Sequence, residues 1–264
     1  MFITEFDSAP GIISPENIIS KVDNMPEVCI GVFSQVIVKK LVEKYNGVFL
    51  TERISVSGNL PIYKICVDGI GFAIFAPFLG GAGSARCMEE LIPMGGKYFV
   101  FTGSCGVLRH DIADGHLIIP TSAIRDEGLS FHYVEAADEI EMDSRLVGLA
   151  RDTLSDLHLP FVEGKTWTTD AFYRETKGKM EQAKDMGAIC VEMECASLAA
   201  VAQYRQVPYV QFLWSADNLD APEWDRRGIG SERHKSVGEK CMIAAIEIGK
   251  RLKDAIHKEE KNEL

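Results

Sequence analysis

The sequence predicts an α/β fold in which helices flank a mixed, largely internal sheet. Short apolar runs typical of buried strands alternate along the chain with segments of helical periodicity. The turn Asp68-Gly69 separates two of these runs, residues 62–67 and 72–76, and so indicates a hairpin. Because a hairpin joins antiparallel strands, we expect the sheet to be mixed rather than purely parallel.

The expected elements follow one another without an internal repeat or a low-complexity linker. Strands are expected at residues 28–34, 62–67, 72–76, 97–102, 116–119, 164–169, 188–191 and 209–215. Helices are expected at residues 36–45, from the glycines at 80–83 to about 94, at 145–157 and 177–186, from 195 onward, and at 232–257. We interpret residues 1–264 as one domain, with an N-terminal extension (1–25) and a charged tail (258–264).

Composition excludes several classes of protein. The formal net charge of −11 disfavours binding to nucleic-acid backbones or anionic membranes. No apolar run approaches 18 residues, and the first residues lack the pattern of a signal peptide. The seven cysteines are scattered through apolar segments without metal-ligand spacing, so we expect reduced thiols in a cytoplasmic protein.

The most informative segment is CVEMECASLAA at residues 190–200. Glu192 and Glu194 flank Met193 directly after an apolar strand and directly before a helix rich in small residues. Ligand groups in α/β proteins lie at such carboxyl ends of strands, and a bare carboxylate there needs a partner. A second interpretation stays open, since acids in the first turn of a helix stabilise its dipole.

Other strands also end in polar or glycine-rich groups. These are Gly103-Ser104-Cys105-Gly106, residues 170–174, and Ser215 to Asp217. Strand ends that converge on one crevice are the expected geometry of an α/β active site.

Taken together, these motifs resemble the nucleoside phosphorylase family of the hexameric purine nucleoside phosphorylase and uridine phosphorylase type. The resemblance runs from about Cys29 to the C-terminal helix. Residues 80–108 (GGAGSARCMEELIPMGGKYFVFTGSCGVL) are similar to the family's glycine-rich segment, helix and GSCG loop, and VEMECA to its ribose-binding motif. The resemblance implies a single three-layer domain with a central mixed sheet.

The resemblance also implies substrate-binding roles. Glu194 would accept hydrogen bonds from the ribose hydroxyls, which suits a carboxylate facing a cis-diol. Met193 would pack under the sugar, Glu192 would orient the loop or contact the base, and Phe172 would stack on the base. For Met193 and Phe172, ordinary core packing remains the alternative. The segment with Ser104, Cys105 and Gly106 would touch the sugar or phosphate through hydroxyl and backbone N–H groups.

The catalytic roles implied by the resemblance fall on Asp217 and Arg233. Purine-cleaving members use an Asp at this position to protonate N7 of the base, which is general acid catalysis. They pair it with an Arg at the start of the last helix, where Arg233 stands. Uridine-cleaving members use a Gln and Arg pair instead, and after Phe172 this chain has Arg174 but no such Gln.

The chain departs from the family pattern at the phosphate site. Residues 31–35 read GVFSQ, so Gln35 replaces one phosphate-binding Arg while Gly31 is kept. Phe101 replaces a second Arg, and Lys64 aligns with the third, which hexameric enzymes supply from a neighbouring subunit. Lysine offers only a point charge where arginine binds phosphate through two hydrogen bonds. A family His near the N-terminus is also missing, and Asp7 and Ser8 lie in that region.

Three functions therefore compete. The first is phosphorolysis of a purine nucleoside to the free base and ribose 1-phosphate, with phosphate held by Ser104, Gly31, Lys64 and a relocated cation such as Arg86 or Arg53. The second is phosphate-independent hydrolysis, and the third is nucleoside binding without catalysis. A uridine phosphorylase is a further alternative. The resemblance implies no metal or organic cofactor, inorganic phosphate as co-substrate, and a homo-oligomer built from dimers, up to a hexamer.

Overall fold

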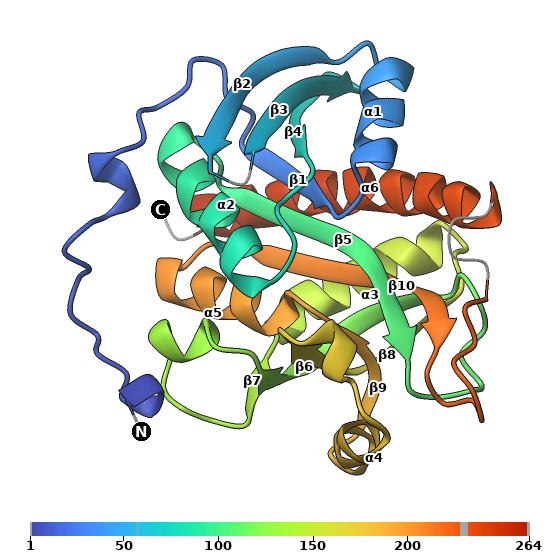
Figure 1. The fold of residues 1–264 in the computed structure, drawn as a ribbon. Coiled ribbons are helices and arrows are strands. Elements are labelled where there is room, and N and C mark those ends of the chain that lie inside the picture. Colours follow the sequence, from blue (N-terminus) through green and yellow to red (C-terminus); the bar gives the residue numbers. More distant parts are fainter. Residues whose placement is uncertain (1, 57, 228–231, 263–264) are drawn as a thin grey trace.

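A computed structural model shows one ten-stranded mixed sheet with helices on both faces (Figure 1). The structure describes residues 2–56, 58–227 and 232–262, and the side chains of 3–56, 58–227 and 236–258. The strands are β1 (Val28–Val32), β2 (Val48–Ser55), β3 (Gly58–Val67), β4 (Ile70–Phe75), β5 (Tyr98–Val107), β6 (Leu117–Asp126), β7 (Glu139–Glu141), β8 (Phe161–Thr169), β9 (Ala188–Glu192) and β10 (Tyr209–Asn218). The α-helices are α1 (Gln35–Lys44), α2 (Gly81–Met94), α3 (Ser144–Asp156), α4 (Lys177–Asp185), α5 (Cys195–Arg205) and α6 (Glu232–Asn262). Short 3₁₀ helices are η1 (Phe2–Thr4), η2 (Pro15–Asn17), η3 (Ser130–His132) and η4 (Phe172–Arg174).

Part of the sheet closes on itself. Its strand order is β10-β6-β8-β9-β5-β1-β4-β3-β2, and β10 also pairs with β5. The strands β5, β10, β6, β8 and β9 therefore form a closed ring, from which β1, β4, β3 and β2 extend as an open wing. The predicted hairpin around Asp68 is confirmed, since β3 and β4 pair antiparallel there and Asp68 has a φ of 50°.

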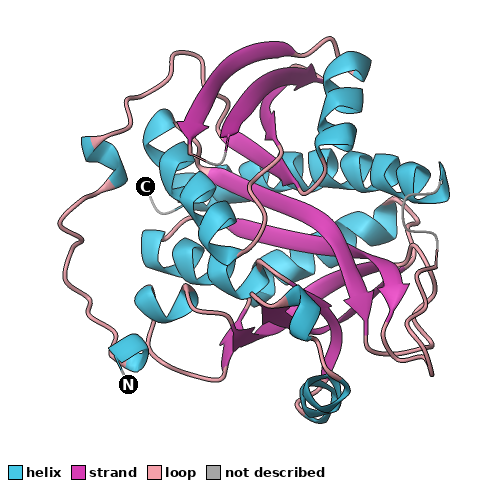
Figure 2. Cartoon of the chain, viewed as in Figure 1, coloured by secondary structure: helices cyan, strands magenta, loops and turns pink. Residues whose placement is uncertain are grey.

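The helices lie on both faces of the sheet (Figure 2), over its two largest hydrophobic clusters. On one face α1, α3 and α6 pack side chains such as Leu41, Leu154 and Ile248 onto the sheet. On the other face α2 and α5 pack against each other and against Phe75 and Phe101. The three-layer α/β fold expected from the sequence is thus confirmed. The small side chains at the start of α5 are all buried, which lets this helix lie close to the sheet and to α2.

The structure corrects several expected boundaries. β2 was not expected as a strand, because its half-exposed edge position leaves no regular alternation of apolar and polar residues. β5 extends through the whole GSCG motif, which the sequence placed in a loop, because β9 and β10 both pair with its end. Of the seven cysteines, Cys66 is exposed and the other six are buried. None of the described helices is both long and apolar enough to cross a membrane.

Candidate active site

Three strand ends meet at Gly106. In the sheet register Gly106 of β5 lies opposite Val191 of β9 on one side and Asp217 of β10 on the other. A Cβ atom at Gly106 would lie 2.5 Å from Cδ1 of Leu219 and 3.2 Å from Oδ1 of Asp217. A larger residue here would crowd side chains of β9, of β10 and of the segment after β10, and the pairing at Gly106 places Asp217 and the Glu192–Glu194 segment on either side of β5.

Glu192 organises this segment from inside the protein. Its Oε2 accepts hydrogen bonds from the backbone N–H groups of Glu194 (2.8 Å) and Cys195 (2.7 Å). Its Oε1 accepts from the hydroxyls of Thr168 (2.5 Å) and Thr166 (3.3 Å). Burial raises the pKa of the carboxyl, while these donors favour its charged form. With both oxygens engaged inside the protein, Glu192 is suited to orienting the loop rather than to contacting a base.

Glu194 joins the two sequence motifs to each other. Its Oε1 accepts a hydrogen bond from the N–H of Gly80 at 2.8 Å, and the side chain is only 5% exposed. Gly80 has a φ of 81°, a backbone conformation that favours glycine. Burial, followed by the charge of Glu192, raises the pKa of Glu194 to about 8. A polar ligand that donates hydrogen bonds to Glu194 would offset the cost of this buried carboxylate.

Phe172 lies at the surface, in η4, directly after β8. Its ring is 48% exposed and packs edge-on against the exposed ring of Tyr173, with centroids 5.0 Å apart. The alternative that Phe172 fills the core is therefore wrong. Met193 is half-buried between the two glutamates, and Arg174 is exposed. An exposed aromatic face beside a strand end suits stacking on a flat ligand.

Asp217 is a buried acid, 8% exposed, at the end of β10. Its Oδ2 accepts a hydrogen bond from Nε1 of Trp224 at 2.7 Å. Glu175, which follows η4, has its pKa raised to about 7 by burial and then by the negative charge of Asp217. The carboxyl groups of Glu175 and Asp217 are thus close enough to interact electrostatically. The side chain of Arg233, the expected partner of Asp217, lies outside the described side chains.

The expected phosphate ligands do not assemble within the chain. Ser104 is exposed on β5, and the Cys105 thiol beside it is buried with its pKa raised by that burial. Gly31 is buried inside β1, between β4 and β5, and the ring of Phe101 covers it. The ring of Phe101 thus fills the space beside Gly31, and a contact between Gly31 and phosphate stays a prediction.

The three expected cations, Arg86, Arg53 and Lys64, make their contacts elsewhere. Arg86 is half-exposed on α2 and pairs with Glu90 at 2.9 Å, and Arg53 binds the same carboxylate at 2.9 Å. Glu90, one helical turn away, thus holds the guanidinium of Arg86 at the surface of α2 rather than beside Ser104. Lys64 aligns with Ala73 and donates to the carbonyl of Asn24 at 3.5 Å. That place is near the start of β1, whereas Ser104 lies beyond its end, so Lys64 is remote from the site of its own chain.

Comparison with known proteins identifies the family. Residues 41–257 match the model of the phosphorylase superfamily. The chain belongs to the phosphorylase superfamily.

Several relatives carry nucleoside-phosphorylase names. The chain is 29% identical over 157 residues to guanosine phosphorylase of Halorubrum lacusprofundi, covering 58% of this chain and 64% of that protein. It is 27% identical over 150 residues to uridine phosphorylase of Escherichia coli, covering 50% and 58%. It is 29% identical over 132 residues to purine nucleoside phosphorylase of Plasmodium falciparum, covering 49% and 54%. The matched segments thus span a little over half to just under two thirds of these relatives.

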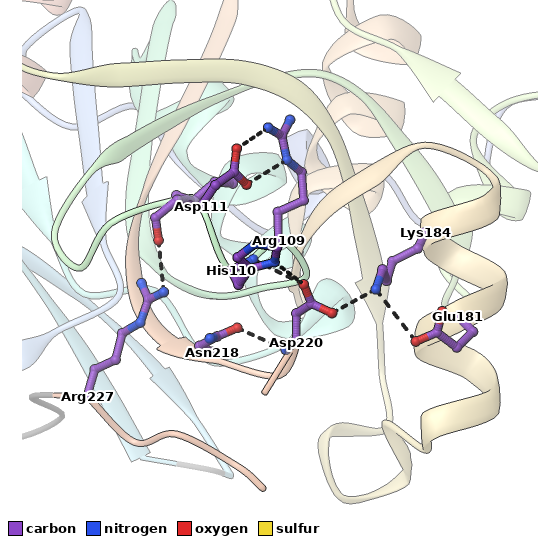
Figure 3. A network of polar contacts seen from close by, with 9 residues as sticks. Arg109, His110, Asp111, Glu181, Lys184, Asn218, Asp220 and Arg227 are labelled. Atoms are coloured by element: carbon purple, nitrogen blue, oxygen red, sulfur yellow. Dashed lines mark hydrogen bonds and ion pairs between the residues drawn. The ribbon is translucent and has the colours of Figure 1, made fainter. Parts of the chain in front are cut away.

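In this member of the phosphorylase superfamily a network of polar contacts fixes the loop after β10 (Figure 3). Asp220 accepts hydrogen bonds from the backbone N–H of His110 (3.1 Å) and from Lys184 of α4 (2.7 Å). Lys184 holds the pKa of Asp220 below its usual range. Arg227 donates to the carbonyl of Ile112 at 2.8 Å and to the Ser215 hydroxyl at 3.4 Å. The loop that carries Trp224 is therefore tied to three parts of the molecule.

The sequence interpretation did not single out Trp224. A tryptophan within an otherwise polar stretch, seven residues after Asp217, was the one available signal. Among the described residues, no three His, Cys, Asp or Glu side chains lie close enough together to hold a metal ion.

Proposed function

We propose that this protein cleaves the N-glycosidic bond of a purine nucleoside by phosphorolysis, releasing the free base and ribose 1-phosphate. The observation that carries the proposal is the buried acid Asp217, which lies beside Gly106 at the strand ends that also carry Glu194. Membership of the phosphorylase superfamily and the names of its relatives support the same reaction.

In the proposed mechanism Phe172 stacks on the base and Glu194 accepts hydrogen bonds from the ribose hydroxyls. Asp217 donates its proton to N7 of the purine as the bond between C1′ and N9 breaks, so the base leaves as a neutral molecule. A phosphate oxygen then forms the new bond to C1′ of the oxocarbenium-like sugar. Glu192 takes part indirectly, since its four hydrogen bonds hold the Glu194 loop in position.

The residues of a single chain support binding of the nucleoside better than binding of phosphate. Ser104 and the backbone near it remain the candidates on β5. Lys64 is remote from Ser104 in its own chain, so it could serve only the site of another subunit, and we expect a homo-oligomer, dimer-based and up to a hexamer, as the resemblance implies. We expect Arg233 to assist Asp217, no metal or organic cofactor to be needed, and the protein with its free cysteines to act in the cytoplasm.

A second candidate is phosphate-independent hydrolysis of the nucleoside. The observation that favours it is Phe101, an apolar ring at a position where the resemblance implies a phosphate-binding Arg. Nucleoside binding without catalysis is the third candidate. A uridine phosphorylase is disfavoured by Asp217, although several relatives bear that name.

The test is release of free base from guanosine, inosine, adenosine and uridine, with and without inorganic phosphate. We expect release from purine nucleosides only when phosphate is present. Asp217→Asn should lower this turnover roughly a hundredfold, and Asp152→Asn on the exposed face of α3 serves as the control. Equal release without phosphate would favour hydrolysis. A nucleoside that raises the melting temperature without any release of base would favour the binding protein.

A further inference from the structure

Trp224 makes a contact that no sequence motif indicated. Its indole N–H donates to Oδ2 of Asp217 at 2.7 Å, although the side chain itself is 55% exposed. Tryptophan is a large apolar residue, and a purely structural one would bury more of its ring. The half-exposed ring and the buried acid therefore indicate that the contact serves Asp217 rather than the core.

The chain around Trp224 is built to hold this contact. Asn218 and Asp225 exchange two backbone hydrogen bonds, of 2.9 and 3.1 Å, which close residues 218–225 into a compact loop. Asp220 ties the first half of the loop to α4, and Arg227 ties its end to the carbonyl of Ile112 (Figure 3). The guanidinium of Arg226 lies 5.5 Å from the centre of the indole ring. These ties limit the positions the indole can take.

We propose that Trp224 is a positioning residue that orients the Asp217 carboxyl and strengthens it as an acid. The proposal rests on the proposed function, in which Asp217 gives its proton to N7. When the proton leaves, a carboxylate remains, and a hydrogen bond from an indole N–H favours this charged form. Trp224 thus stabilises the charge that develops on Asp217 as the glycosidic bond breaks.

Other titratable groups face Asp217 and have to be controlled for. Glu175, between η4 and α4, interacts with it electrostatically, and so does the buried thiol of Cys105 on β5. Negative charge on Glu175 disfavours ionisation of Asp217, which opposes the effect of Trp224. On α6, Arg233 lies outside the described side chains. The dependence of kcat/KM on pH is therefore measured for Trp224→Phe both in the wild-type protein and in Glu175→Gln. A shift that appears in both cannot be caused by Glu175.

The test is Trp224→Phe, which keeps an aromatic ring and removes the N–H. For inosine or guanosine we expect kcat/KM to fall by about tenfold to a hundredfold, mainly through kcat. The alkaline limb of the profile should move to higher pH, because Asp217 becomes a weaker acid, in both backgrounds. N7-methylguanosine carries its positive charge before the reaction and needs no proton at N7, so its cleavage should be unchanged.

Two results would overturn the proposal. One is an unchanged kcat/KM for inosine, and the other is an equal loss on the N7-methylated substrate. The pKa of Asp217, followed by carbon NMR of the carboxyl in both proteins, tests it without any activity. It should rise in Trp224→Phe, and an unchanged value would contradict the proposal. If the wild-type protein releases no base from any nucleoside, the proposed function fails, while the NMR comparison still decides whether Trp224 controls Asp217.

Discussion

Phe101 lies directly against Gly31, so that a Cβ atom at Gly31 would come within 2.5 Å of Cε1 of the Phe101 ring. The ring also packs against Phe33, Phe75 and Tyr209, with centroids 5.9 to 6.1 Å away. The position where the resemblance implies a phosphate-binding Arg is thus part of the apolar core. A phosphate in this protein must be held by other groups, which is why phosphate dependence is the decisive question.

Gly31→Ala should destabilise the protein by about 1–3 kcal/mol, since the added methyl group overlaps a ring that is packed on all sides. Gly148→Ala is the matched control, because a Cβ atom at Gly148 meets nothing within 4 Å and alanine favours the helix α3. The free energy of unfolding in urea measures both. If the two variants have the same free energy of unfolding, the Phe101 ring can shift to accommodate the methyl group at little cost.

Glu192→Gln should cost about 1–3 kcal/mol, because an amide NH₂ would replace an oxygen that accepts hydrogen bonds from buried donors. The affinity for a nucleoside should fall as well, since the Glu194 loop loses an anchor. Urea unfolding and calorimetric titration with inosine measure the two effects. If Glu192→Gln binds inosine with unchanged affinity, Glu192 does not position Glu194.

Glu194→Gln should stabilise the unliganded protein at alkaline pH. In the folded protein the pKa of Glu194 is raised to about 8, from an ordinary value of 4.5. Between these values the folded protein keeps a proton that the unfolded chain releases, so this group lowers the free energy of unfolding as pH rises. The glutamine side chain of the variant has no such proton, and its amide oxygen still accepts from Gly80. The advantage of the variant should therefore grow between pH 4.5 and 8. Urea unfolding at about pH 5 and about pH 8.5 measures it, and a difference independent of pH would contradict the raised pKa.

Phe172→Ala should raise the KM for a purine nucleoside by roughly threefold to tenfold, which corresponds to the loss of one stacking contact. The melting temperature should change little, because the ring is half-exposed. Phe49→Ala, which removes an exposed aromatic ring from β2, is the control and should leave KM unchanged. If the KM of Phe172→Ala is unchanged, the base does not stack on Phe172.

Much of the fold follows from local patterns in the sequence. The apolar runs, the Asp68-Gly69 turn and the small residues after Glu194 predict the layers, because burial and turn geometry depend on residues close together in the sequence. Contacts between residues far apart in the sequence cannot be predicted in this way. The extension of β5 through residues 103–106 depends on β9 and β10 pairing with its end, and β9 and β10 lie about 80 residues or more away in the chain.

The residues of the candidate site also divide into those that local motifs predict and those that depend on long-range contacts. Glu194, Phe172 and Asp217 were predicted because the motifs around them are local. Trp224 was missed, since its hydrogen bond to Asp217 arises from a loop tied down by Lys184 and Arg227. Arg86 was expected to bind phosphate, whereas its guanidinium pairs with Glu90, four residues further along the same helix.

The most direct test of the central claim is the identity of the sugar product. Purified protein is incubated with guanosine and inorganic phosphate, and the phosphorus NMR spectrum is followed while guanine is measured by its absorbance. Phosphorolysis predicts a ribose 1-phosphate signal that grows in step with guanine as the inorganic phosphate signal declines. Guanine that appears together with free ribose, while the phosphate signal stays constant, would contradict it.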